Sequence, residues 1–143
     1  MSNTKKKEIE LTKKLDKEKV FLSLKAKDFM TKEFTSVNPE SSIRETLLLM
    51  KKNNQTGCPV IEKGGKIVGI ISDYDILLQV SQKNLDEKIF FKRDLISVTS
   101  DAPLKEVLVT FVRFKLKRIP VVDAFQKLIG VINREEFIFK IFE

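Results

Sequence analysis

The residue types in this chain restrict the chemistry that it can perform. Its 143 residues include no histidine and a single cysteine, Cys58. Histidine is the usual general base near neutral pH and the commonest metal ligand, so every nucleophile pair that needs histidine is excluded. One cysteine combined with carboxylates would ligate zinc poorly. We therefore predict a protein that is not an enzyme and that requires no metal or cofactor.

Two pairs of polar residues share one spacing. Ser72 and Asp75 lie three positions apart, as do Asn133 and Glu136. This is the spacing of a capping box, in which side chains satisfy free backbone N–H groups at the start of a helix. Capping explains both pairs equally. Nothing beside Cys58 would lower its pKa, so we interpret it as a small packed residue.

The net charge of +7 is concentrated near the N-terminus. Residues 1–27 carry nine lysines against four acidic residues, a balance of +5, which leaves +2 for the rest of the chain. A lysine-rich leader is more often a solubilising segment than a nucleic-acid arm, and no aromatic motif for base stacking follows it. The adjacent cations Lys117 and Arg118 are consistent with a solvated strand end.

The sequence also bears on cellular location. No apolar run approaches the roughly 20 residues of a membrane span, and no hydrophobic stretch follows the first residues as it would in a signal peptide. A single cysteine cannot form an intramolecular disulfide bond, which is typical of a reducing compartment. We expect a cytoplasmic protein.

The chain repeats itself at an interval of 61 residues. The clearest recurring identities are Val37/Val98, Pro59/Pro120, Val60/Val121, Gly69/Gly130 and Ile71/Ile132. Hydrophobic character is mostly kept between these positions. Two copies of one supersecondary unit predict a molecule with pseudo-twofold symmetry and a cleft between its halves. Gly69 and Gly130 are interpreted as close-packing positions.

Each repeat is predicted to contain a strand, a helix, a β-hairpin and a second helix. In the first repeat, residues 34–37 are β-prone, and residues 42–45 form a capping box before an apolar helix face. Strands over residues 58–61 and 67–71 are joined by a Gly-Gly turn, which indicates a hairpin. A helix follows over about residues 73–80.

Several motifs in this order carry a likeness to a known family. They are Asp-Phe-Met-Thr at 28–31, Ser-Val-Asn-Pro at 36–39, Gly-Cys-Pro-Val-Ile at 57–61, Gly-Ile-Ile-Ser-Asp-Tyr-Asp at 69–75, Lys-Arg-Ile-Pro-Val-Val-Asp at 117–123 and Gly-Val-Ile at 130–132. The chain resembles the cystathionine-β-synthase (CBS) domain, which occurs in tandem pairs called Bateman modules. The resemblance implies an α/β fold of two β-α-β-β-α repeats with pseudo-twofold symmetry, after an N-terminal helix. We divide the chain into a lysine-rich, partly helical segment (1–25), a first repeat (26–82) and a second repeat (83–143).

The resemblance also implies two clefts that bind adenosine-containing ligands. An aspartate takes the ribose hydroxyls, and basic residues before the other repeat's Pro-Val face the phosphates. Carried over, one site comprises Ser36, Val37, Cys58, Pro59, Ser72, Asp75, Lys117 and Arg118. A second, degenerate site comprises Ser97, Val98, Ile119, Pro120, Asn133 and Glu136. There Thr56 and Gly57 stand where the basic pair should be, so we expect no positive charge at the second site. A carboxylate can accept from two hydroxyls, and cations bind phosphate with charge assistance.

The function implied by the resemblance is that of a non-catalytic sensor, which binds an adenine nucleotide (AMP, ADP or ATP) and signals to a separate partner. S-adenosylmethionine and cyclic di-AMP are the next candidate ligands. Alternatives are a structural or dimerising module with empty clefts, and a nucleic-acid binder that acts through the leader. The second helix of each repeat is apolar on two faces, which favours a homodimer. The apolar residues are Ile76, Leu77, Leu78 and Val80 in one helix and Phe137, Ile138, Phe139, Ile141 and Phe142 in the other.

Overall fold

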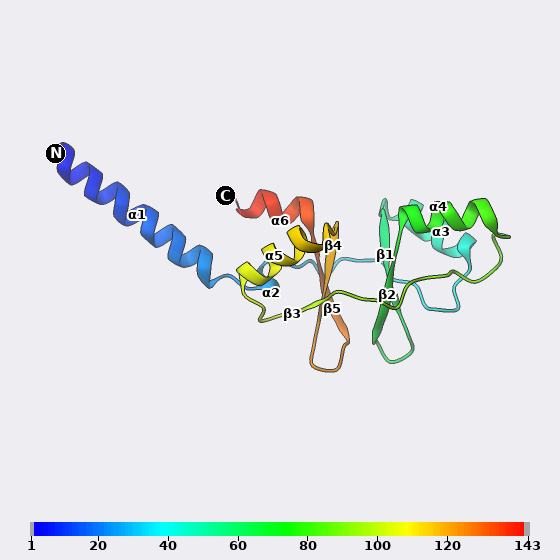
Figure 1. Ribbon diagram of the computed structural model, residues 1–143. Coiled ribbons are helices and arrows are strands. Elements are labelled where there is room, and N and C mark those ends of the chain that lie inside the picture. Colours follow the sequence, from blue (N-terminus) through cyan, green and yellow to red (C-terminus); the bar gives the residue numbers. More distant parts are fainter. Residues whose placement is uncertain (1, 142–143) are drawn as a thin grey trace.

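The computed structural model describes residues 2–141, and for residues 12 and 14–21 it describes the backbone alone. Two α/β repeats lie side by side, and the long helix α1 (Asn3–Ser23) projects away from them (Figure 1). This helix confirms the predicted N-terminal helix. It contacts the second repeat at α5 (Leu104–Phe114). None of the helices in the described part of the chain is long and apolar enough to cross a membrane.

The first repeat follows the predicted order closely. Its elements are α3 (Ile43–Lys52), β1 (Gly57–Ile61), β2 (Ile67–Ser72) and α4 (Asp73–Gln82). The Ser42 hydroxyl accepts from the Glu45 N–H at 3.0 Å, and Glu45 accepts from the Ser42 N–H at 3.3 Å, so the predicted capping box starts α3. The hairpin of β1 and β2 turns at Gly64 and Gly65, whose φ angles of 103° and 95° favour glycine.

The second repeat has the same order with one more strand. Its elements are β3 (Val98–Thr99), α5, β4 (Arg118–Val122), β5 (Leu128–Asn133) and α6 (Arg134–Ile141). β3 pairs in parallel with β4, which pairs antiparallel with β5. In the first repeat the strand expected at 34–37 is reduced to a single parallel bridge between Val37 and Val60. Pro39, which has no N–H to donate, follows shortly after and limits the pairing.

The segment at the start of the first repeat packs into the second repeat. Helix α2 (Ala26–Phe29) buries Ala26 and Phe29 in the second core, where Phe29 meets Phe137 edge to face with ring centroids 4.9 Å apart. Thr31 and Val131 exchange backbone hydrogen bonds of 2.8 and 2.9 Å. The second repeat is therefore completed by residues from the start of the first.

The equivalent segment at the start of the second repeat packs into the first. Ile89 is buried in the first core, and its N–H donates to the Ser41 carbonyl at 2.9 Å. The buried Gln79 amide donates to the Phe90 carbonyl at 2.8 Å and accepts from the Phe90 N–H at 2.6 Å. The two repeats thus exchange their leading segments, an arrangement that the linear division of the chain did not predict.

Two glycines make room for these exchanged segments. A Cβ atom on Gly130 would lie 2.6 Å from the Met30 sulfur, and one on Gly69 would lie 2.6 Å from the Lys92 carbonyl oxygen. The Lys92 carbonyl is fixed in the backbone, so position 69 requires glycine, whereas a side chain at position 130 would displace Met30. The interpretation of these glycines as close-packing positions is confirmed.

Helices α4 and α6 each bury one apolar face and expose another. Ile76 and Phe137 are 2% and 1% exposed, whereas Leu77 and Phe139 are 66% and 65% exposed. Phe142, which we included in this apolar surface, lies outside the described residues. The exposed apolar faces agree with the expectation of a second buried surface but do not test it.

Candidate functional site

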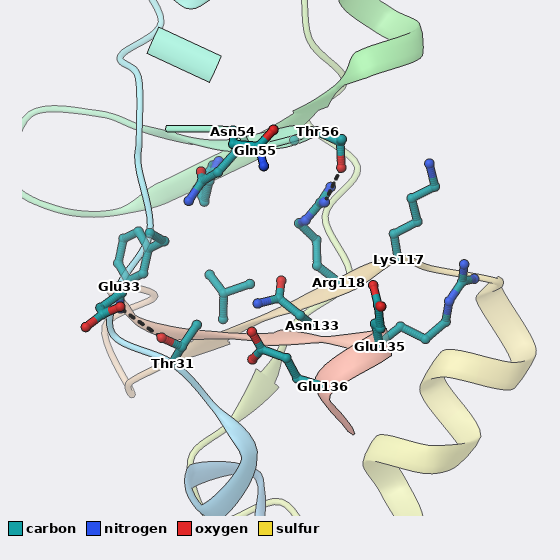
Figure 2. A pocket seen from close by; sticks show the side chains of 15 residues that line it. Thr31, Glu33, Asn54, Gln55, Thr56, Lys117, Arg118, Asn133, Glu135 and Glu136 are labelled. Atoms are coloured by element: carbon teal, nitrogen blue, oxygen red, sulfur yellow. Dashed lines mark hydrogen bonds between the residues drawn. The ribbon is translucent and has the colours of Figure 1, made fainter. Parts of the chain in front are cut away.

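A cavity of about 450 Å³ lies between the two repeats (Figure 2). This volume is within the range of small-molecule sites. Its lining comes from the start of the first repeat (Thr31, Glu33, Phe34), the turn before β1 and the start of β1 (Asn54, Gln55, Thr56, Gly57, Pro59), and the second repeat (Lys117, Arg118, Val131, Asn133, Arg134, Glu135, Glu136). Side chains from both repeats therefore face one space.

Arg118 reaches across this space from the second repeat to the first. Its Nη2 donates to the Thr56 hydroxyl at 2.8 Å, as the dashed line in Figure 2 shows. Burial lowers the pKa of the Arg118 guanidinium from its usual value, and the nearby Asp73 carboxylate opposes that shift. Arginine remains protonated in proteins, so a half-buried cation with further free N–H groups borders the cavity.

Lys117 supplies a second cation at the same edge. Its Nζ lies 3.8 Å from the Asp73 carboxylate at the start of α4, and both side chains are about half exposed. An exposed pair at this distance contributes little to stability. The Lys117 ammonium group can therefore exchange this partner for a bound anion at small cost.

The second repeat also carries hydrogen-bond acceptors beside these cations. Asn133 pairs with Arg118 in the β4–β5 ladder, and Glu136 follows in the first turn of α6. Figure 2 shows the side chains of Asn133 and Glu136 below that of Arg118. An ionised carboxylate accepts hydrogen bonds from hydroxyl groups. The Glu136 acceptor and the Arg118 cation therefore line the same cavity. Among the described residues, no group of three or more potential ligands could hold a metal ion.

Only some residues of the site predicted around Asp75 line this cavity. Pro59, Lys117 and Arg118 line it, while Ser72 and Asp75 do not. Ser72 Oγ accepts from the Asp75 N–H at 3.1 Å, and Asp75 Oδ2 accepts from the Ser72 N–H at 3.1 Å. These two residues form the predicted capping box of α4.

The other residues of that predicted site lie in the core or at the surface. Val37 and Cys58 are buried in the first core, and Ser36 is exposed beside a separate hollow. The Cys58 thiol donates to the Thr35 carbonyl at 3.0 Å. Burial raises the pKa of Cys58 to about 11 although the positive charge of Arg118 opposes the shift. A protonated, buried thiol fits the interpretation of a packed residue.

The second predicted site, which we expected to be degenerate, contributes two polar side chains to the cavity. Asn133 and Glu136 line the cavity, whereas Val98, Ile119 and Pro120 are buried and Ser97 is half-buried. The expectation that this site would lack positive charge is wrong. Gly57 has no side chain, so the Arg118 guanidinium from the same repeat as Glu136 fills the space beside it.

Some lining residues had no recognisable signal in the sequence. Glu33 and Gln55 lie outside the motifs, and Arg134 follows Asn133 without a distinctive pattern. Their place depends on how the start of the first repeat crosses to the second. Nothing in the local sequence indicates that crossing.

The chain belongs to the CBS domain family. The sequence model of the CBS domain matches residues 26–82 and again residues 87–143, which confirms the tandem pair. Among solved structures, the CBS domain pair of protein MJ0100 in complex with 5′-methylthioadenosine and S-adenosyl-L-methionine is 26% identical. It has a TM-score of 0.73, and the match covers 83% of this chain and 95% of that one. CBSX2 in complex with AMP is 28% identical with a TM-score of 0.72, over 81% of this chain and 94% of that one.

Relatives found by sequence are longer proteins. An uncharacterised protein of Methanocaldococcus jannaschii is 27% identical over 117 residues, which are 82% of this chain and 44% of that protein. The inosine-5′-monophosphate dehydrogenase of Korarchaeum cryptofilum is 29% identical over 116 residues, 81% of this chain and 24% of the enzyme. The chain spans about half the length of its curated relatives or less.

Proposed function

We propose that this chain is a non-catalytic regulatory module that binds an adenine nucleotide between its CBS repeats. The observation that carries the proposal is the cavity in which Lys117 and Arg118 face Asn133 and Glu136. Two similar solved CBS pairs hold AMP or adenosyl compounds, which supports the same ligand class here. AMP, ADP and ATP are the first candidates, followed by S-adenosylmethionine and cyclic di-AMP.

Each part of the nucleotide has a candidate partner in this cavity. The two cations would bind the phosphate by charge-assisted hydrogen bonds. Glu136 would accept from the ribose hydroxyls, and the apolar surface of Pro59 and Val131 would contact the base. Asp75, with Ser72, remains the candidate for a ribose contact in the other cleft that the resemblance implies.

Signalling would follow from the position of the ligand between the repeats. A ligand that contacts both repeats favours the relative arrangement that fits it, and the population shifts accordingly. To act as a regulator, this shift must be read at a second surface by a separate partner or an attached segment. The exposed apolar faces of α4 and α6 are the candidates for that surface.

Differential scanning fluorimetry with a nucleotide panel tests the proposal. At a ligand concentration about 100 times Kd, binding stabilises the folded state by about 2.7 kcal/mol. This corresponds to a rise in melting temperature on the order of 5–12 °C for a domain of this size. We expect the rise with adenine nucleotides and not with the matching pyrimidine nucleotides. The absence of any rise with adenosyl compounds at millimolar concentration would favour an empty, structural module.

A further inference from the structure

The N-terminal strap, which we define as residues 24–34, runs from the end of α1 across the second repeat to the cavity. Its first residue holds the end of α1 against the second repeat, because the Leu104 N–H donates to the Leu24 carbonyl at 3.1 Å. The residues of the strap that line the cavity are Thr31, Glu33 and Phe34. One continuous segment therefore connects α1 with the proposed ligand site.

The strap forms a wall of this cavity. Thr31 and Val131, which both line the cavity, exchange backbone hydrogen bonds of 2.8 and 2.9 Å. Figure 2 shows Thr31 and Glu33 at one side of the cavity, where the Glu33 N–H donates to the Thr31 hydroxyl at 3.0 Å. Just beyond the strap, the Thr35 N–H donates to the Gln55 side-chain oxygen at 3.3 Å. If the strap separates from Val131, this wall is lost, so a ligand that contacts it binds the closed strap more tightly.

One helical turn and several exposed contacts hold the strap to the second repeat. Helix α2 has four residues, two of which are buried. At the surface, the Lys27 Nζ lies 3.5 Å from the Asp101 carboxylate, and the Lys140 ammonium group donates to the Asp28 carbonyl. Exposed ion pairs contribute little to stability. We therefore expect the strap to open locally at a lower free energy than the strands behind it.

We propose that the N-terminal strap is a latch between the ligand site and α1. A ligand in the cavity holds the strap closed and α1 against the second repeat, and the ligand-free strap opens locally and releases α1. The proposal rests on the function proposed above and names the segment through which binding is signalled. A ligand that binds only the closed strap lowers the open population by the factor 1 + [ligand]/Kd. By linkage, a partner that holds α1 in the released position weakens ligand binding by as much as the ligand weakens that partner.

Hydrogen–deuterium exchange of the full chain, with and without AMP, tests the latch. The reporting N–H groups are those of Ala26 and Thr31 in the strap and of Leu104, which donates to the strap. Without AMP, all three should exchange faster than the N–H groups of the β4–β5 ladder. At an AMP concentration about 100 times Kd, the three should slow together, by up to about 100-fold.

Three results would overturn the latch. If the three N–H groups exchange as slowly as the β4–β5 ladder without AMP, the strap opens only when the protein unfolds, although the proposed function stands. If AMP slows Thr31 but neither Ala26 nor Leu104, α1 is independent of the ligand site, and again only the latch is wrong. If neither AMP nor S-adenosylmethionine raises the melting temperature, the proposed function and the latch are both overturned.

Lys140→Ala loosens the strap at a residue that does not line the cavity. It removes the hydrogen bond to the Asp28 carbonyl and the ammonium group that lies 5.6 Å from the centroid of the Phe29 ring. Without AMP, the three reporting N–H groups should exchange about 3- to 10-fold faster, all by the same factor.

The matched control is Lys83→Ala, because the Lys83 ammonium group lies 5.7 Å from the centroid of the Phe90 ring at the equivalent place in the first repeat. It should leave the exchange of the three reporting N–H groups unchanged. Unequal factors among the three groups in Lys140→Ala, or equal exchange in the two variants, would show that the strap does not open as one unit and would refute the latch.

Discussion

Replacing Glu136 by glutamine tests which carboxylate receives the ribose. Glu136 lines the cavity, and its ionised side chain can accept from two neighbouring hydroxyls once a ligand covers it. Hydrogen bonds to charged groups contribute about 1.5–3 kcal/mol and neutral ones about 0.5–1.5 kcal/mol. Glu136→Gln should therefore remove about 2–3 kcal/mol over two bonds, a loss of affinity of about 30- to 150-fold.

Asp75→Asn is the matched control because it makes the same charge change at the equivalent position. Asp75 Oδ2 accepts from the Ser72 N–H at 3.1 Å, and an asparagine oxygen can keep that bond. We expect its AMP affinity to change less than about threefold. Calorimetry gives Kd for both variants, and the melting temperature of the ligand-free proteins verifies the fold. A large loss for Asp75→Asn with none for Glu136→Gln would refute the choice of cavity and place the nucleotide in the other cleft.

Three further predictions concern stability, assembly and reactivity. Phe137→Ala should destabilise the fold by about 3–5 kcal/mol in chemical denaturation, because Phe137 is 1% exposed and its ring lies 4.9 and 5.1 Å from those of Phe29 and Phe111; a loss below about 1 kcal/mol would contradict its place in the core. Light scattering at micromolar concentration should give a homodimer for the wild type and a monomer for Phe139→Glu, because Phe139 is 65% exposed on an apolar face; a monomeric wild type would disprove the dimer. The Cys58 thiol, with a pKa of about 11, should resist thiol reagents at pH 8 until the protein is denatured, and rapid labelling of the folded protein would show that the site is open.

The parts of the fold that depend on local sequence were predictable. The capping boxes at Ser42 and Ser72 and the hairpin turn at Gly64 follow from spacings of a few residues, and all three are present. The repeat interval predicted the pseudo-twofold symmetry, and the order of the motifs carried the resemblance to the family.

The contacts that make the cavity were not predictable in the same way. The hydrogen bond between Arg118 and Thr56 joins residues 62 positions apart, and it depends on an empty space at Gly57. The resemblance assigned Arg118 to the cleft of Asp75 because it places each residue by its position in a motif. The Arg118 side chain instead reaches Gly57 and Thr56 in the other repeat, and only the three-dimensional arrangement reveals these contacts.

The exchange of leading segments determines the smallest fragment that can fold. A fragment that ends at residue 82 would lack Ile89, and one that starts at residue 83 would lack Ala26 and Phe29. Each would leave an apolar groove open to pairing with another copy or to aggregation. We expect the two repeats to unfold together in one cooperative transition. A nucleotide bound in either cleft would then protect the whole pair against unfolding.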